Sequence, residues 1–227
     1  MAIDKTMQKK IAEDWLGAFP QLTAYSLNKL YKVAGCCGIG IELFKLPFAM
    51  DEYRPYFVIY PLWKTDLKSC LDAPFLMVAL HNKKGLQFDI PYSNSHLFLN
   101  EAMDCLKKQI PFAMNGDIAL KSLFSLIDHH LDNILYKSNS AQQAKLLKLK
   151  FYISLYEEYK IHSVLKQIKK RSSTWNLQLF EYWYGNFNSW FKNIENQIIH
   201  KDNFLRQIEM NKQNKSIRKL YVSEFIV

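Results

Sequence analysis

The spacing of hydrophobic positions changes character near Ser93. Before that residue, most apolar side chains alternate with period two, as in strands, and after it they recur every three or four residues, as in helices. The sequence predicts an α+β fold: an N-terminal antiparallel β-meander of four to five strands with a flanking helix, then a C-terminal bundle of about five helices. The expected division is 1–93 for the sheet and 94–227 for the bundle, although the two could form one integrated domain.

The first elements are a helix and a segment that fits two structures. Residues 3–16 carry apolar side chains at every fourth position, which predicts an amphipathic helix ended by Gly17 and Pro20. Residues 22–33 fit either a strand or a helix. The strand is favoured because Ala34-Gly35 then makes a tight turn into a clear strand at 36–45.

Glycine and proline mark special positions in the predicted sheet. Gly38 and Gly40 share one face of the strand at 36–45 and leave room there for a close neighbour. Pro61 lacks an N–H donor, so the strand at 56–63 is expected at a sheet edge or with a bulge near its end. A hairpin is expected over 75–90, turning at Asn82-Lys83-Lys84-Gly85.

Five helices are expected in the second half. The longest runs from Ser140, in the capping-box pattern Ser140-x-x-Gln143, to about Lys170, and its two apolar sides predict a central position in the bundle. The last residues, 220–227, are apolar and could add a strand or dock on the core. The other helices are expected at 96–109, 117–136, from about Thr174 to a break at Gly185-Asn186, and from about Asn188.

Composition indicates a protein with a sizeable core in a reducing compartment. Apolar residues make up 49% of the chain and aromatic residues 15%, which excludes a disordered protein. The four cysteines show no C-x-x-C spacing, so they are interpreted as small buried side chains. No secretory signal or run long enough to span a membrane is recognisable, and a cytoplasmic location is expected.

Positive charge is concentrated in the second half. Residues 1–113 carry 13 Lys and Arg against 11 Asp and Glu, whereas residues 114–227 carry 17 against 10. Such asymmetry suggests an anionic partner, although lysine also serves solubility. Lysine greatly outnumbers arginine, which weakens the case for specific phosphate or base contacts.

No residue set carries a recognisable catalytic, cofactor or metal motif. The cluster Asp128-His129-His130-Leu131-Asp132 could begin a metal site, but adjacent histidines point about 100° apart on a helix, so a solvated helix face is the better interpretation. Phosphate-binding glycine loops and nucleophile elbows are absent. We therefore expect no cofactor, and the chain leans away from being an enzyme, although distant segments could still assemble an active site.

Two surfaces are candidates for binding. Tyrosine and tryptophan anchor protein interfaces, and their excess favours an intracellular protein-interaction role. The protein partner, or a second copy of the chain, would bind a surface of the sheet or the aromatic helix pair at 174–191. The alternative is nucleic-acid binding through the basic helix at 140–171. The loop 51–55, with its charges and tyrosines, is a third possible contact. The candidate binding residues are Lys166, Lys169, Lys170, Arg171, Trp175, Trp183, Trp190, Tyr53 and Arg54.

Overall fold

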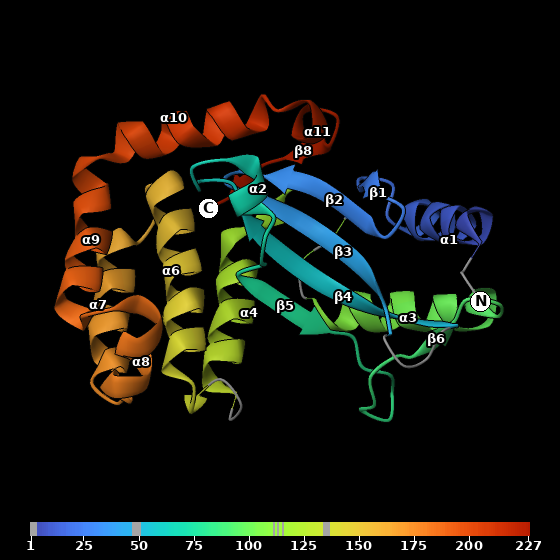
Figure 1. Cartoon of the computed structure of the whole chain (residues 1–227), viewed down its shortest axis with the longest axis horizontal. Coiled ribbons are helices and arrows are strands. Elements are labelled where there is room, and N and C mark those ends of the chain that lie inside the picture. Colours follow the sequence, from blue (N-terminus) through green and yellow to red (C-terminus); the bar gives the residue numbers. More distant parts are fainter. Residues whose placement is uncertain (1–3, 47–50, 111, 113, 115, 134–136) are drawn as a thin grey trace.

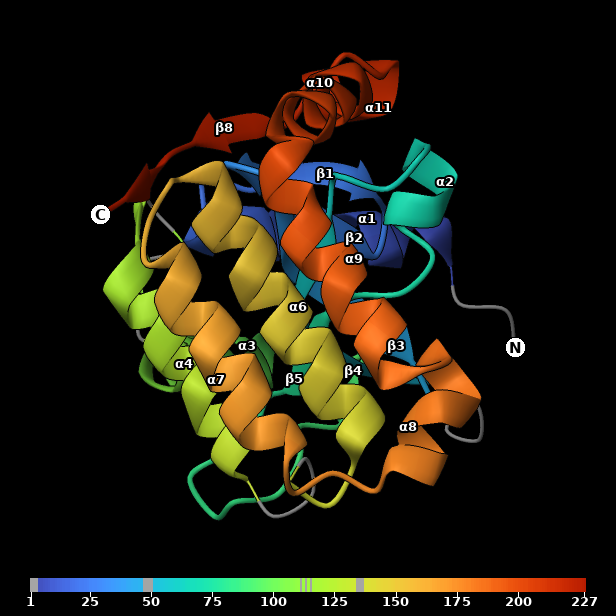
Figure 2. The same ribbon diagram turned by 90° about the vertical axis from the view of Figure 1, so that its left-hand side faces the viewer.

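The structure is a computed structural model that describes residues 4–46, 51–110, 112, 114, 116–133 and 137–227. Its N-terminal part is an antiparallel sheet with a flanking helix, and its C-terminal part is helical, so the predicted fold class is confirmed (Figure 1). The helices of the second half lie side by side, with α4 between the sheet and α6, and α10 crosses one end of them (Figures 1 and 2).

Among the described residues, seven strands form one sheet around a central antiparallel meander. The order is β1-β2-β3-β4-β5, with β6 beside β4 and β8 parallel to β2, and a separate parallel pair joins β7 to β9. The strands are β1 Thr23–Ser26, β2 Lys29–Ala34, β3 Cys37–Lys45, β4 Glu52–Pro61, β5 Leu76–Ala79, β6 Ile90–Pro91, β7 Ile118–Ala119, β8 Tyr221–Ser223 and β9 Phe225–Ile226.

The helices surround this sheet and continue into the bundle. Asparagine or aspartate caps several of them, and Asn139, not Ser140, caps α6 by accepting a hydrogen bond from the Gln142 amide at 3.1 Å. The helices are α1 Lys5–Ala18, α2 Leu67–Cys70, α3 Ser95–Gln109, α4 Leu120–Asp132, α6 Ser140–Tyr156, α7 Ile161–Ser172, α8 Leu177–Tyr184, α9 Phe187–Ile199, α10 Lys201–Lys212 and α11 Lys215–Arg218.

The ambiguous segment at 22–33 is extended, as favoured, but it contains a hairpin of its own, β1 to β2. Gly35 then closes the tight turn into β3 with φ of +50°, a conformation that glycine adopts without steric cost. The space left by glycine on β3 is also used: Gly40 pairs with Tyr31, and a Cβ atom at Gly40 would lie 1.9 Å from the carbonyl oxygen of Leu30.

Two expectations about the sheet need correction. β4 is a central strand, and Pro61 is tolerated because pairing with β5 ends at Ile59, so no neighbour on that side needs its N–H. The turn at residues 82–85 forms as expected, with Gly85 at φ of +78°, but the returning arm shares only the bridge His81–Gln87 and then leaves β5 to pair with β4 as β6.

The expected helix at 140–170 is two helices. Glu158 and Lys160 adopt left-handed conformations with φ of 53° and 54°, and the chain reverses there so that α7 runs back along α6. The other long C-terminal helix also divides, at His200. The central position of α6 is confirmed, because residues all around it are buried. The part of the predicted helix at 134–136 lies outside the described residues.

Lys32, on β2, is a charged residue inside the core. Its ammonium group donates a hydrogen bond to the Gly116 carbonyl at 2.7 Å, and the residue is fully buried. Burial lowers the pKa of Lys32 to about 8, against the opposing effect of Asp117. An unfolded lysine titrates near 10.4.

We expect the protein to become more stable as pH rises through this interval, relative to the variant Lys32→Met. Below pH 8, both folded and unfolded chains carry the Lys32 proton, so the folded state bears the full cost of a buried charge. Between the two pKa values only the unfolded chain keeps the proton, and from pH 7 to 10 stability then rises by about 2 kcal/mol. Denaturant unfolding from pH 7 to 10 measures the free energy of unfolding of the parent and of Lys32→Met. A difference between the two that does not change with pH would contradict the prediction.

Candidate functional site

Helix α8 exposes most of its apolar side chains. Its sequence, Leu-Gln-Leu-Phe-Glu-Tyr-Trp-Tyr, is mainly apolar, yet Phe180 is its one fully buried residue. Tyr182 is 81% exposed and Trp183 65% exposed, and their rings are in edge contact at 5.3 Å. Leu179 precedes them by one helical turn, so the three share the outward side of the helix. We call Leu179, Tyr182 and Trp183 the α8 face.

A cluster of packed aromatic rings supports the α8 face from below. The Phe180 ring lies 5.2 Å from Trp175, 5.3 Å from Tyr184 and 5.3 Å from Trp190, measured between centroids. Trp175 and Trp190, both expected to contribute to a binding surface, are therefore largely buried, and of the three tryptophans chosen in this region Trp183 alone presents its ring to solvent. The four-residue spacing of Trp175, Leu179 and Trp183 predicted that one helix presents all three side chains. This was wrong for Trp175, which precedes α8, because α8 begins at Leu177.

A pocket of about 340 Å³ adjoins the α8 face at the first turns of α6. Lys145 is half-buried in its wall, and no ion pair joins this lysine to any carboxylate in the described part of the chain. The pocket is lined by Asn139, Ala141, Gln142, Lys145, Trp183 and Tyr184.

Lys145 belongs to a group of three lysines that gathers around aromatic rings. The ammonium groups of Lys64 and Lys145 lie 5.7 and 5.8 Å from the centroid of the Phe75 ring, and that of Lys148 lies 5.8 Å from the Tyr152 ring. Burial, and then the charge of Lys64, hold the pKa of both Lys145 and Lys148 below its usual value. None of the three lysines pairs with a carboxylate among the described residues, so this region carries uncompensated positive charge.

The four cations selected on α7 do not converge. Lys169 lies 3.6 Å from the Glu195 carboxylate and 4.8 Å from the centroid of the Phe191 ring, so it faces α9. Arg171 turns the other way, to α4, and donates to Asp132 at 2.7 Å. Lys166 and Lys170 are exposed. The four cationic side chains therefore do not share one side of α7, and two of them pair with carboxylates.

Tyr53 and Arg54 lie in β4, not in a loop. The Tyr53 side chain is fully buried, and its hydroxyl is 2.7 Å from the Ser95 hydroxyl and accepts from the Trp15 indole at 3.3 Å. Arg54 pairs with Asp89 at 2.6 Å. Both residues therefore tie the sheet to its surroundings, with Tyr53 inside the core.

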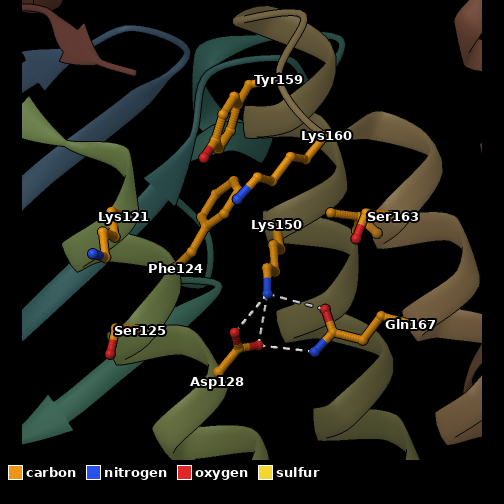
Figure 3. Close-up of a pocket in the computed structure, with 10 residues that line it drawn as sticks. Lys121, Phe124, Ser125, Asp128, Lys150, Tyr159, Lys160, Ser163 and Gln167 are labelled. Atoms are coloured by element: carbon orange, nitrogen blue, oxygen red, sulfur yellow. Dashed lines mark hydrogen bonds and ion pairs between the residues drawn. The ribbon is translucent and has the colours of Figure 1, made fainter.

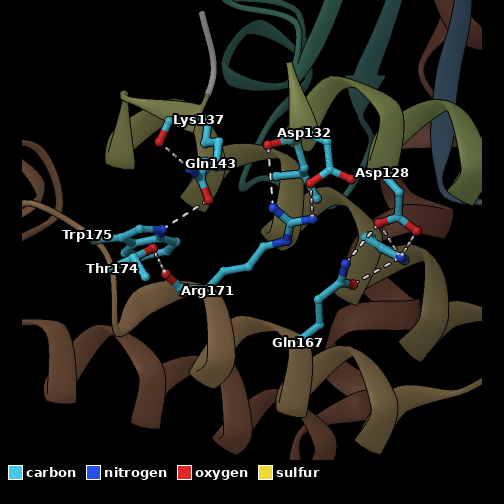
Figure 4. A network of polar contacts seen from close by, with 10 residues as sticks. Asp128, Asp132, Lys137, Gln143, Gln167, Arg171, Thr174 and Trp175 are labelled. Atoms are coloured by element: carbon cyan, nitrogen blue, oxygen red, sulfur yellow. Dashed lines mark hydrogen bonds and ion pairs between the residues drawn. The ribbon is translucent and has the colours of Figure 1, made fainter. Parts of the chain in front are cut away.

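The acidic side of α4 is joined to the neighbouring helices by a polar network (Figure 4). Lys150 donates to both carboxylate oxygens of Asp128 at 2.7 Å, and the Gln167 amide bridges the pair by accepting from Lys150 and donating to Asp128. Asp132 is exposed, as expected of a solvated helix face, although it pairs with Arg171; the expectation needs correction for Asp128, which is half-buried and joins α4 to the neighbouring helices.

The two histidines of the same cluster face a different depression. Together with His81 they line a cavity of about 510 Å³, and burial lowers the pKa of His130 to about 4, an effect that His129 reinforces. Within the described ranges no three potential metal ligands gather at one point.

A third pocket, of about 360 Å³, opens between α4, α6 and α7 beside the network (Figure 3). Lys160 extends over the Tyr159 ring at 4.8 Å from its centroid, and Lys150 lies 5.1 Å from the centroid of Phe124. No pattern in the sequence indicated this site, because its walls depend on the reversal between α6 and α7, which was not predicted. It is lined by Lys121, Phe124, Ser125, Asp128, Lys150, Tyr159, Lys160, Ser163, Val164 and Gln167.

Comparison of the chain with protein-family models, with curated proteins and with solved structures found no match. None of the described helices combines the length and the apolar character that crossing a membrane requires.

Proposed function

We propose that the protein is a non-enzymatic interaction protein that binds an acidic partner protein through the α8 face. The supporting observation is that Tyr182 and Trp183 are 81% and 65% exposed on a helix whose Phe180 packs against other aromatic rings. Aromatic side chains bury large areas on binding and lose little conformational entropy.

Charge favours an acidic protein over a second copy of the chain as the occupant. The chain carries a net charge of +9, so two copies would repel each other. Beside the α8 face, half-buried Lys145 has a lowered pKa and no carboxylate partner within the described residues. A partner that places an apolar group on Trp183 and a carboxylate against Lys145 would satisfy both features. The dispersal of the α7 cations favours this role over nucleic-acid binding.

The cytoplasm is the compartment in which we place this interaction. All four cysteines are free and buried, and Cys36 and Cys37 lie with their sulfur atoms 3.9 Å apart without a disulfide. Such thiols are typical of proteins kept in a reducing compartment.

A photo-crosslinking amino acid at position 182, compared with one at position 10 on α1, identifies what covers the α8 face in cells. We expect a crosslink to an acidic protein from position 182, and not from position 10. With the partner purified, Trp183→Ala should weaken binding by about 30-fold or more, as for an interface hot spot. Lys145→Glu should weaken it through charge, whereas the matched variant Lys10→Glu should not.

Each variant residue is at least partly exposed, so thermal unfolding should stay close to that of the parent and separate binding from folding. A crosslink between two copies of the chain, or a partner whose affinity is unchanged by Trp183→Ala, would contradict the proposal.

A further inference from the structure

The pocket between α4, α6 and α7 has an excess of positive charge that the fold does not use. Its wall contains the three lysines Lys121, Lys150 and Lys160 against one carboxylate, Asp128. Lys150 neutralises Asp128 through contacts at 2.7 Å to both oxygens. Lys121 and Lys160 enter no ion pair with the described residues, and both are exposed at the rim of the pocket. The two charges are therefore available to a ligand.

Hydroxyl groups stand beside these lysines. Ser125 projects from α4 and Ser163 from the first turn of α7, and both line the pocket with the ring of Tyr159 (Figure 3). Neither serine hydroxyl donates or accepts a hydrogen bond within the described part of the chain. A ligand with several oxygen acceptors would find donors from two helices and from the lysines between them.

Helix α7 begins beside this pocket, because Lys160 and Ser163 both line its wall. Lys160 stands at the N-cap in a left-handed conformation, with φ of 54°, and its side chain provides no cap. The first helical bond is from the Val164 N–H to the Lys160 carbonyl at 3.1 Å, so the preceding N–H groups of the turn remain without acceptors among the described residues. Together with the helix dipole, these groups favour an anion.

We propose that this pocket binds the phosphate group of a small molecule, held by Lys160 and by the hydroxyl of Ser163, while Lys121 on the opposite rim and the nearby start of α7 add positive potential. Phosphate matches the site because its oxygens accept from ammonium and hydroxyl donors at once. The volume of about 360 Å³ suits a small ligand. The site lies at the N-terminal end of α7, whereas α8 follows the C-terminal end, so this proposal is independent of the α8 face (Figure 2).

Isothermal titration of the whole protein with inorganic phosphate, pyrophosphate and adenosine monophosphate tests the proposal. We expect saturable binding of at least one of them, weakened about tenfold or more by Lys160→Met, which removes a charge-assisted hydrogen bond, and less by Lys121→Met, which removes only a charge at the opposite rim. Equal affinity for phosphate and the monophosphate would identify free phosphate as the ligand. Tighter binding of the monophosphate would identify a phosphate ester.

The matched control is Lys170→Met, which removes one exposed charge from the same helix but outside the pocket. It should leave the affinity within about twofold of the parent. Ser163→Ala, which keeps the net charge, should weaken binding without altering its salt dependence. No saturable binding by the parent, or an equal loss in Lys170→Met and Lys160→Met, would overturn the proposal.

Discussion

Asp128→Ala should lower the free energy of unfolding by about 3 kcal/mol, because it leaves a charged lysine inside the protein without its partner. The Lys150 side chain is 8% exposed, and it donates to both oxygens of Asp128 and to Gln167. Removing the carboxylate leaves the largely buried ammonium group with the Gln167 side chain as its one acceptor among the described residues. We place the effect at the lower end of the range for buried pairs because the Asp128 side chain is 38% exposed.

The converse variant should be much milder. Lys150→Met removes the buried charge and keeps most of the side-chain volume, while Asp128 can still reach water, so we expect a loss of about 1 kcal/mol. Asp128→Leu combined with Lys150→Met should recover most of the stability. Urea unfolding of the three variants measures their free energies of unfolding. Equal destabilisation by Asp128→Ala and Lys150→Met would show that the unpaired buried charge is not the cause.

Gly40→Ala should destabilise the protein by at least about 3 kcal/mol or prevent folding, because the new methyl group has no room. Its Cβ would lie 1.9 Å from the Leu30 carbonyl oxygen, a backbone atom of the neighbouring strand, and 2.8 Å from the Tyr31 ring. Neither can withdraw without breaking the pairing of β2 with β3.

Gly38→Ala is the matched control, since Gly38 lies on the same strand and the same face. Its Cβ would meet only the Tyr60 Cβ, at 3.8 Å, an ordinary van der Waals contact. We expect this variant to fold with nearly unchanged stability. Circular dichroism and thermal unfolding of both variants make the comparison, and equal destabilisation would contradict the steric explanation.

Periodicity predicted the fold class because burial imposes it directly. The alternating strand at 36–45 and the two-sided helix from 140 are both present, since each pattern fits one way of covering apolar surface. The break at Glu158 to Lys160 was missed because this stretch contains neither glycine nor proline, and its left-handed residues pay a local cost that the packing of α7 against α6 offsets.

The polar residues were harder to interpret because their partners come from distant segments. Asp128 and Asp132 lie one turn apart on α4, and that spacing alone indicates a charged helix face. The cations that meet them come from two other helices, Lys150 from α6 and Arg171 from α7, and the placement of α7 depends on the missed reversal. The same reversal places Lys160 and Ser163 in the wall of the proposed phosphate pocket, so this pocket could not be predicted without it.

The parallel strand β8 has a consequence for how the chain folds. Ser223 donates to the Val33 carbonyl across 190 residues of sequence, so this edge of the sheet closes a very long loop. Closing so long a loop costs conformational entropy that has to be offset by contacts formed earlier. We therefore infer that the helices assemble before β8 pairs with β2. Until then the stretch Lys32 to Ala34 is an open strand edge, and the inward ammonium group of Lys32 would hinder a foreign strand from adding there. Lys32 lowers the stability of the finished core, and the same charge would limit aggregation while the chain folds.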